Sequence, residues 1–176
     1  MIVSVERIKQ LVNLDGWTDE KIRMKLDAIE QTIRAYTNNN FQNRGFRVKA
    51  DIAASVIMSE ALIPFDVGDT VQVSESLKNN GLYTITEAYD LTAVVEENTH
   101  DESDVLVTKV EYPADVVACA VNLMEWEANM REKVGIQSET LSRHSVTYAN
   151  ADGANQVMGY PASLLGCLKA YRKARC

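Results

Sequence analysis

The sequence predicts an α+β fold that is mainly α: a small bundle of about four helices with an inserted small antiparallel β subdomain. Three observations support this prediction. The hydrophobic period is helical up to about residue 37, becomes two near Phe46, and is helical again after Pro113. We therefore expect a helical core, with a C-terminal arm and tail, from residues 1–45 and 111–176, and a β subdomain from residues 46–110.

Two helices are expected before the β region. Ser4 can cap a short helix at about 5–14, and Thr18 can cap a longer helix at about 18–37. In the longer helix the apolar side chains recur at helical spacing, at Ile22, Leu26, Ile29, Ile33 and Tyr36. The asparagines at 38–40 end this helix, because their side chains compete for backbone hydrogen bonds.

Short runs of alternating apolar and polar residues follow, as expected of strands with one buried face. Turn or loop signals separate five such runs, at 46–51, 70–74, 82–87, 91–96 and 105–110. Residues 52–63 fit either a short helix or a strand that continues into a loop. Strands this short, with turns this frequent, indicate a small twisted sheet or barrel.

The central helix is expected at 113–134. Pro113 suits the first helical turn, and the charge of Asp115 suits the helix dipole. Two adjacent apolar stripes predict that the first half is covered on more than one side. The second half is expected to reach solvent, because its charged residues are Glu125, Glu127, Arg131, Glu132 and Lys133.

After the central helix, residues 137–149 are polar and alternate in the way that a strand or an extended arm does, at Ser145, Val146, Thr147 and Tyr148. A final helix is expected at about 161–173, with its leucines on one face. The end of the chain is basic, since residues 161–176 contain no acid and four cations: Lys169, Arg172, Lys173 and Arg175.

Composition narrows the function classes. The chain has 176 residues and a net charge of -7, which argues against general nucleic-acid binding. It contains no apolar run of membrane-spanning length and no signal-peptide pattern, so we expect a cytosolic protein. Of the three cysteines, Cys119 and Cys167 are expected to be small buried hydrophobes, and Cys176 an exposed thiol.

No enzyme signature is found, and we expect no catalytic residue, cofactor or metal ligand. The two histidines are His100 and His144, and the serines near His144 are too close in sequence to imply a nucleophile and its base. No phosphate loop, zinc spacing or nucleophile elbow is present. The acidic loop 96–104 lacks the order of a calcium loop and is expected to be solvated.

The order of the elements provides a family resemblance. Two helices, a β insertion, a long helix, and the segments GIQSETLSRHSVTY (135–148) and GYPASLLGCLKAYRK (159–173) together resemble the head–tail connector proteins of long-tailed phages, also called adaptor or head-completion proteins. The resemblance spans nearly the whole chain and is most specific in these two segments. The β insertion is its least typical part.

The resemblance implies a structural virion protein. Its subunits form a ring, dodecameric in the virion, beneath the portal protein, and the ring extends the DNA channel without binding DNA specifically. A stopper or tail-completion protein binds the ring's other side. Assembly takes place in the host cytoplasm, and the final location is the head–tail interface; no membrane is involved.

Two sites are expected under this resemblance. Residues 137–149 would pair with a neighbouring subunit through their backbone, chiefly at Ser145, Val146, Thr147 and Tyr148. The basic C-terminal end would bind the portal protein through Lys169, Arg172, Lys173 and Arg175. An acidic body would let DNA pass without holding it.

A second interpretation is a monomeric regulatory or nucleic-acid-binding module that uses the β insertion. Its candidate surface combines cations with aromatic rings, which suits single strands: Arg44, Arg47, Lys49, Phe41 and Phe46. Five acidic residues in the loop 96–104 argue against this surface.

Overall fold

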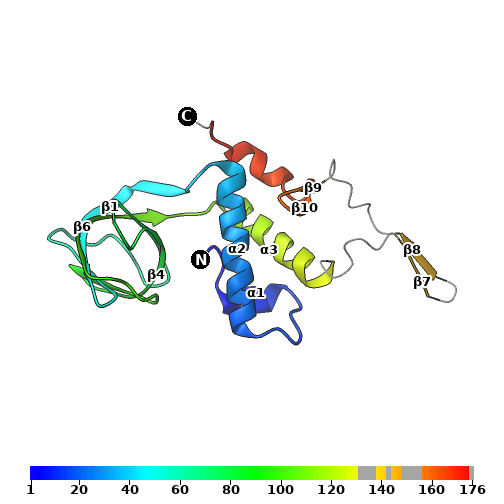
Figure 1. Ribbon diagram of the computed structural model, residues 1–176, viewed down its shortest axis with the longest axis horizontal. Helices are drawn as coiled ribbons and strands as arrows, with labels where there is room; N and C mark the ends of the chain where they lie inside the picture. The colour runs from blue at the N-terminus through cyan, green and yellow to red at the C-terminus, as the bar shows by residue number, and fades with distance from the viewer. Residues whose placement is uncertain (131–137, 142–143, 148–155, 175–176) are drawn as a thin grey trace. The chain divides into compact units, whose positions relative to one another are not determined.

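The computed structural model describes residues 1–130, 138–141, 144–147 and 156–174, and the chain forms two compact units (Figure 1). The barrel unit consists of Met1 and Asn40–Tyr112, and the helical unit consists of Ile2–Asn39 and Pro113–Cys176. The barrel is therefore an insertion in the helical unit along the chain.

Six antiparallel strands close into a barrel in the order β1-β2-β5-β4-β3-β6 (Figure 1). The strands are β1 Gln42–Ala53, β2 Val56–Met58, β3 Thr70–Ser74, β4 Gly81–Ala88, β5 Thr92–Val95 and β6 Glu102–Val110. Closure leaves no strand of this sheet without a neighbour on either side, so the barrel has no open edge.

The prediction of a mainly α protein with a small β subdomain is wrong. The chain contains a complete six-stranded barrel, and strand and helix occupy nearly equal shares of it. The length of β1 explains much of the error. Its pairing with β6 shifts register between Gln42 and Arg47 and again between Ala50 and Ile52. Such irregularities interrupt the strict alternation from which strands are recognised in a sequence.

The barrel interior is filled by apolar side chains from all six strands. In β1, Val48, Ala50 and Ile52 are buried, whereas Lys49 and Asp51 between them are exposed. The connection from β2 to β3 adds Ile63 and Phe65 to the same cluster. The Ile63 N–H donates to the Asp90 carbonyl at 2.8 Å, which continues the sheet-like bonding beyond β2. The ambiguous stretch 52–63 thus contains the end of β1, all of β2 and the start of a loop that enters the core.

The helical unit is built on α2 Asp19–Thr37 and α3 Ala114–Asn129, which pack against each other (Figure 1). Ile22, Leu26, Ile29 and Ile33 of α2 are fully buried, as are Val116, Ala120, Leu123 and Met124 of α3. The short α1 Val5–Leu11 precedes them. The Ser4 hydroxyl accepts the Arg7 N–H at 3.2 Å, and the Thr18 hydroxyl accepts the Lys21 N–H at 3.3 Å, so both predicted N-caps are present.

The C-terminal part differs from the predicted final helix. It contains two short hairpins, formed by β7 Ser138–Leu141 with β8 His144–Thr147 and by β9 Gln156–Val157 with β10 Tyr160–Pro161, and then the 3-10 helix η2 Gly166–Tyr171. Pro161 pairs with Gln156 in a strand instead of starting a helix. Among the described helices, none combines the length and apolar character needed to cross a membrane.

The second half of α3 does not simply reach solvent. Glu125 is exposed, but Glu127 is only 3% exposed, and its carboxylate accepts a hydrogen bond from the Lys25 ammonium of α2 at 3.0 Å. Burial of a carboxylate is tolerated here because a cation of the facing helix compensates for its lost hydration. The sequence of α3 alone does not contain that partner.

Truncating Ile29 tests this helical core. Ile29→Ala should lower the free energy of unfolding by about 2–5 kcal/mol, because apolar contacts are lost and a cavity remains. Leu123→Ala on α3 should have an effect of the same size. Met24 lies on α2 but is 62% exposed, so Met24→Ala is the matched control and should change the free energy by less than about 0.5 kcal/mol. Urea unfolding followed by circular dichroism measures all three; equal effects of Ile29→Ala and Met24→Ala would contradict the buried face assigned to α2.

Candidate functional site

The described residues offer two candidate binding surfaces. Within them, no cluster of three or more histidine, cysteine or acidic side chains is placed to hold a metal ion. The His100 backbone has a structural role, since its N–H donates to the Asn79 side chain at 2.8 Å and its carbonyl accepts from the same side chain at 2.9 Å. His144 lies in β8.

The first candidate surface is the hairpin of β7 and β8. Ser145, Val146 and Thr147 lie in β8, while Tyr148 lies outside the described residues. The predicted extended segment is half of a two-stranded antiparallel sheet, with Leu141 opposite His144 and Ser138 opposite Thr147. A two-stranded hairpin is marginally stable by itself in water, and each strand has an outer edge that can pair with another strand.

The register of this hairpin shows which backbone groups point outward. Only two residues separate Leu141 from His144, so this pair exchanges backbone hydrogen bonds. The pattern then alternates along the strands. From this alternation we infer that Val146 bonds to Glu139 and that the N–H groups of Ser145 and Thr147 point to the outer edge of β8. These two N–H groups are available to a further strand.

The second candidate surface is the basic C-terminal segment. Lys169 lies in η2 and is exposed, as are Arg172 and Lys173; Arg175 lies outside the described residues. The Arg172 guanidinium lies 5.3 Å from the centroid of the Tyr36 ring, and the Lys173 N–H donates to the Thr37 carbonyl at 2.8 Å. The hydrogen bond to Thr37 therefore anchors the backbone of this segment at the end of α2. Lys169 and Lys173 themselves are exposed.

Negative charge is concentrated in the barrel unit. Residues 40–112 contain 13 acidic and 5 basic residues, a net charge of -8, whereas the rest of the chain contains 12 acidic and 13 basic residues and carries +1. The acidic body expected from composition is thus the barrel. A barrel of this charge repels phosphate groups.

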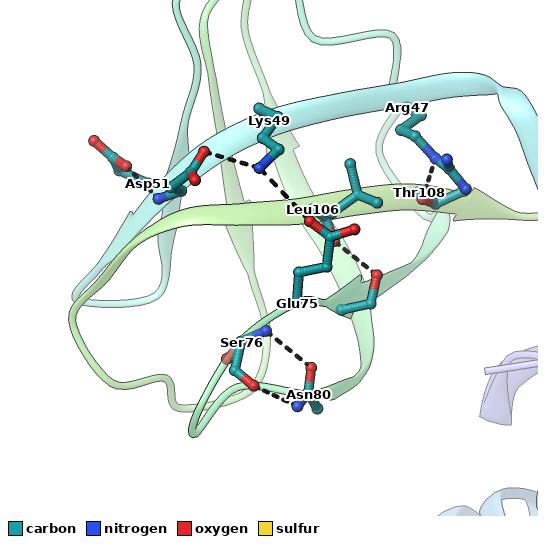
Figure 2. A network of polar contacts seen from close by, with 10 residues as sticks. Arg47, Lys49, Asp51, Glu75, Ser76, Asn80, Leu106 and Thr108 are labelled. Atoms are coloured by element: carbon teal, nitrogen blue, oxygen red, sulfur yellow. Dashed lines mark hydrogen bonds and ion pairs between the residues drawn. The ribbon is translucent and has the colours of Figure 1, made fainter.

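The outer wall of the barrel contains two cations of the second interpretation, Arg47 and Lys49 (Figure 2). The Lys49 ammonium lies 3.0 Å from the Asp104 carboxylate and 3.6 Å from that of Glu75, and the Asp104 hydrogen bond is the main cause of its raised pKa. Arg47 donates to the Thr108 hydroxyl at 3.1 Å.

The aromatic residues of the same interpretation differ in exposure. Phe41 is buried and its ring centroid lies 4.9 Å from that of Tyr112. Phe46 remains 43% exposed. These residues therefore do not form one open basic and aromatic surface.

The sequence signals a turn between β3 and β4 but does not show that Glu102 of β6 fixes this loop in place. The Glu102 carboxylate accepts hydrogen bonds from the Ser76 hydroxyl at 2.6 Å, from the Asn79 amide at 3.1 Å, and from the N–H groups of Leu77 and Lys78. Ser76 and Asn80 also bond to each other twice (Figure 2). The loop presents the Leu77 side chain 94% exposed. The serine and asparagines signal a turn, but no local pattern indicates its distant acceptor.

Titration of Glu102 tests how this loop is held. The Ser76 hydroxyl, followed by the Leu77 N–H, lowers the pKa of Glu102. A lowered pKa means that the contribution to stability is present above the usual glutamate pKa of about 4.3 and is lost as the pH falls through the lowered value. In NMR titrations, the Leu77 and Lys78 amide protons should shift together with a midpoint below that usual value. Glu102→Gln should abolish the step, whereas the same change at exposed Glu60 should leave it; a midpoint at or above the usual value would contradict the assignment.

Comparison with known proteins adds no family: no family model matches the chain, and no curated protein is significantly similar to it.

Proposed function

We propose that this protein is a structural subunit of a phage head–tail connector, which forms a ring beneath the portal protein and joins the head to the tail. The β7–β8 hairpin carries the proposal, because it lies within 135–148, one of the two segments in which the resemblance to connector proteins is most specific. The subunit has no catalytic role in this proposal. Its partners are further copies of the chain, the portal protein, and a stopper or tail-completion protein.

The hairpin supports subunit contacts through backbone pairing. A strand of a neighbouring copy that pairs with β8 would use the outward N–H groups of Ser145 and Thr147 and would turn a two-stranded sheet into a larger one. A contact of this kind joins two different surfaces of identical subunits. Repetition of such a contact closes a ring when the rotation between subunits allows it.

The basic end supports the portal contact. The exposed Lys169 and Lys173 extend from a segment whose backbone is anchored to α2 and α3, so the backbone that carries them is in place before a partner arrives. A backbone that is already in place reduces the entropy lost on binding. The acidic barrel supports passage of DNA without retention, since binding of DNA depends on cations that replace its counterions.

The hypothesis of a nucleic-acid-binding module is not favoured by a specific observation. Phe41 is buried and Lys49 is paired with two carboxylates, which removes two of the five residues from its candidate surface. We therefore propose only the connector.

Proline substitutions in the hairpin test the subunit contact. Thr147→Pro removes an outward N–H while the hydrogen bonds to β7 persist, so the chain should remain folded but fail to form rings with the portal protein encoded in the same genome. Thr140→Pro removes the corresponding outward N–H of β7 and is the matched control; it should assemble as the wild type does. Analytical ultracentrifugation of the mixtures measures ring formation. Normal assembly of Thr147→Pro would contradict the proposed use of β8.

Charge reversal at the C-terminal end tests the portal contact. Lys169→Glu and Lys173→Glu together should leave the free energy of unfolding unchanged, because both ammonium groups are exposed, and should weaken portal binding most strongly at low salt. Arg172 is left intact because it packs on Tyr36. Each exposed charge contributes about 0–1 kcal/mol, and repetition around a ring multiplies the effect.

The matched control for this pair is Lys78→Glu, which reverses an exposed lysine of the barrel loop. It should bind the portal as the wild type does. Equal binding by the double variant and the wild type at low salt, measured by surface plasmon resonance, would remove the basic end from the proposed interface.

A further inference from the structure

Two thiols from distant parts of the chain meet at one carbonyl oxygen. Cys119 lies on α3 and is 1% exposed, and Cys167 lies in η2 and is exposed. The Cys119 Sγ donates to the Leu164 carbonyl oxygen at 3.3 Å, and the Cys167 Sγ donates to the same oxygen at 3.5 Å. Both sulfur atoms lie within hydrogen-bonding distance of this one oxygen. They are therefore neighbours although 48 positions separate them in the sequence.

A second contact shows that this arrangement is built by the surrounding segments. The Tyr171 hydroxyl donates to the Asp115 carboxylate, with 2.7 Å to each oxygen. Asp115 precedes Cys119 by four residues, and Tyr171 follows Cys167 by four residues. The two segments thus run in opposite directions with matched contacts. Leu165 and Leu168, both fully buried, anchor the same C-terminal segment.

We propose that Cys119 and Cys167 form an intramolecular disulfide when the protein moves from a reducing to an oxidising environment, and that this bond fixes the C-terminal segment to α3. The setting rests on the proposed function, since a virion assembled in the reducing host cytoplasm is released into an oxidising medium, where disulfides form and persist. The chemistry itself requires only the chain and a small-molecule disulfide as oxidant.

The reaction starts at Cys167, because its thiol is exposed. Its thiolate attacks a sulfur of oxidised glutathione, forms a mixed disulfide and releases one glutathione thiolate. The Cys119 thiol then loses its proton to solvent, attacks the Cys167 sulfur and displaces the second glutathione. Two protein thiols are oxidised to one disulfide, and one glutathione disulfide is reduced to two thiols.

The second step is the slow one. Burial is the main cause of the raised pKa of the Cys119 thiol and acts whether or not Cys167 has reacted, so the Cys119 thiolate is scarce at neutral pH. Closure of the disulfide should therefore accelerate as the pH rises through the alkaline range. The competing explanation is that both cysteines are only small apolar residues whose thiols satisfy the Leu164 carbonyl.

Oxidation of the full chain in glutathione buffers distinguishes these explanations. Cys176→Ser removes the third thiol, and the two remaining cysteines are followed by alkylation and peptide mass spectrometry at pH 8, with native protein and with protein unfolded in urea. We expect a monomer with a Cys119–Cys167 disulfide whose formation constant is at least about tenfold higher in the native than in the unfolded chain. The urea midpoint of the oxidised protein should rise accordingly, because the two equilibria are linked.

The matched control is Cys119→Ser in the same background, which should stop at the glutathione adduct of Cys167. Equal formation constants in native and unfolded protein, a lower urea midpoint after oxidation, or an adduct without ring closure would each overturn the proposal. None of these results bears on portal binding, which the lysine reversal measures separately. Conversely, loss of the connector proposal would remove the virion setting and leave the disulfide result unchanged.

Discussion

The pairing of β1 with β6 is the constraint on which the rest of the structure depends, because it joins the first and last strands of the inserted barrel. Gln42 lies opposite Val110, the Glu111 N–H donates to the Phe41 carbonyl at 2.9 Å, and the ring of Phe41 packs on that of Tyr112. The chain therefore enters and leaves the barrel at one place. An insertion with adjacent ends interrupts a host fold without separating the elements on either side, and α2 and α3 retain their common apolar seam.

The charged residues and the proposed contact surfaces are distributed unevenly between the two units. The barrel contains the excess of acidic residues, and its longest strands use lysine and arginine mainly to pair with neighbouring side chains, as Lys49 does with Asp104 and Lys109 with Asp69 at 2.7 Å. The helical unit has the exposed basic end and the β7–β8 hairpin. Under the proposed function, the contacts with the portal and with other copies arise from the helical unit. The barrel contributes a negative surface and the exposed Leu77 on a fixed loop.

Local pattern predicted those elements whose hydrophobic period is complete within one segment. The apolar stripe of α2 and its Thr18 cap are both visible in the sequence, and the alternation at 70–74 and 105–110 marks β3 and β6. Register shifts hid the full length of β1, and the three-residue β2 is too short to show a period. The final helix failed as a prediction because Pro161 pairs with β9, and only the six residues of η2 remain helical.

The candidate binding surfaces could also be predicted only where a local pattern marks them. Alternation at Ser145–Thr147 marks β8, but its partner strand Ser138–Leu141 has no apolar alternation and is defined only by its pairing. Burial of Glu127 and fixation of the β3–β4 loop depend on Lys25 and Glu102, which lie far away in the sequence and whose roles exist only in the folded chain. Long-range polar contacts of this kind have no periodic signature in the sequence. A single distant donor or acceptor makes each contact, and one residue does not repeat along the chain.

The segments of the proposed interfaces differ in how they are held, and this difference bears on assembly. The C-terminal segment is bound to α3 through Tyr171 and Asp115 and to α2 through the Lys173 N–H, so a partner meets a surface that is already formed. The two-stranded hairpin has only its own pairing among the described residues. A strand added by a neighbour would supply both the contact and much of the stability of the hairpin, which couples folding of this segment to binding. Such coupling lowers the affinity per contact and makes ring formation depend on concentration and on a template. A portal bound first through the preformed basic end would provide that template by raising the local concentration of hairpins around the ring.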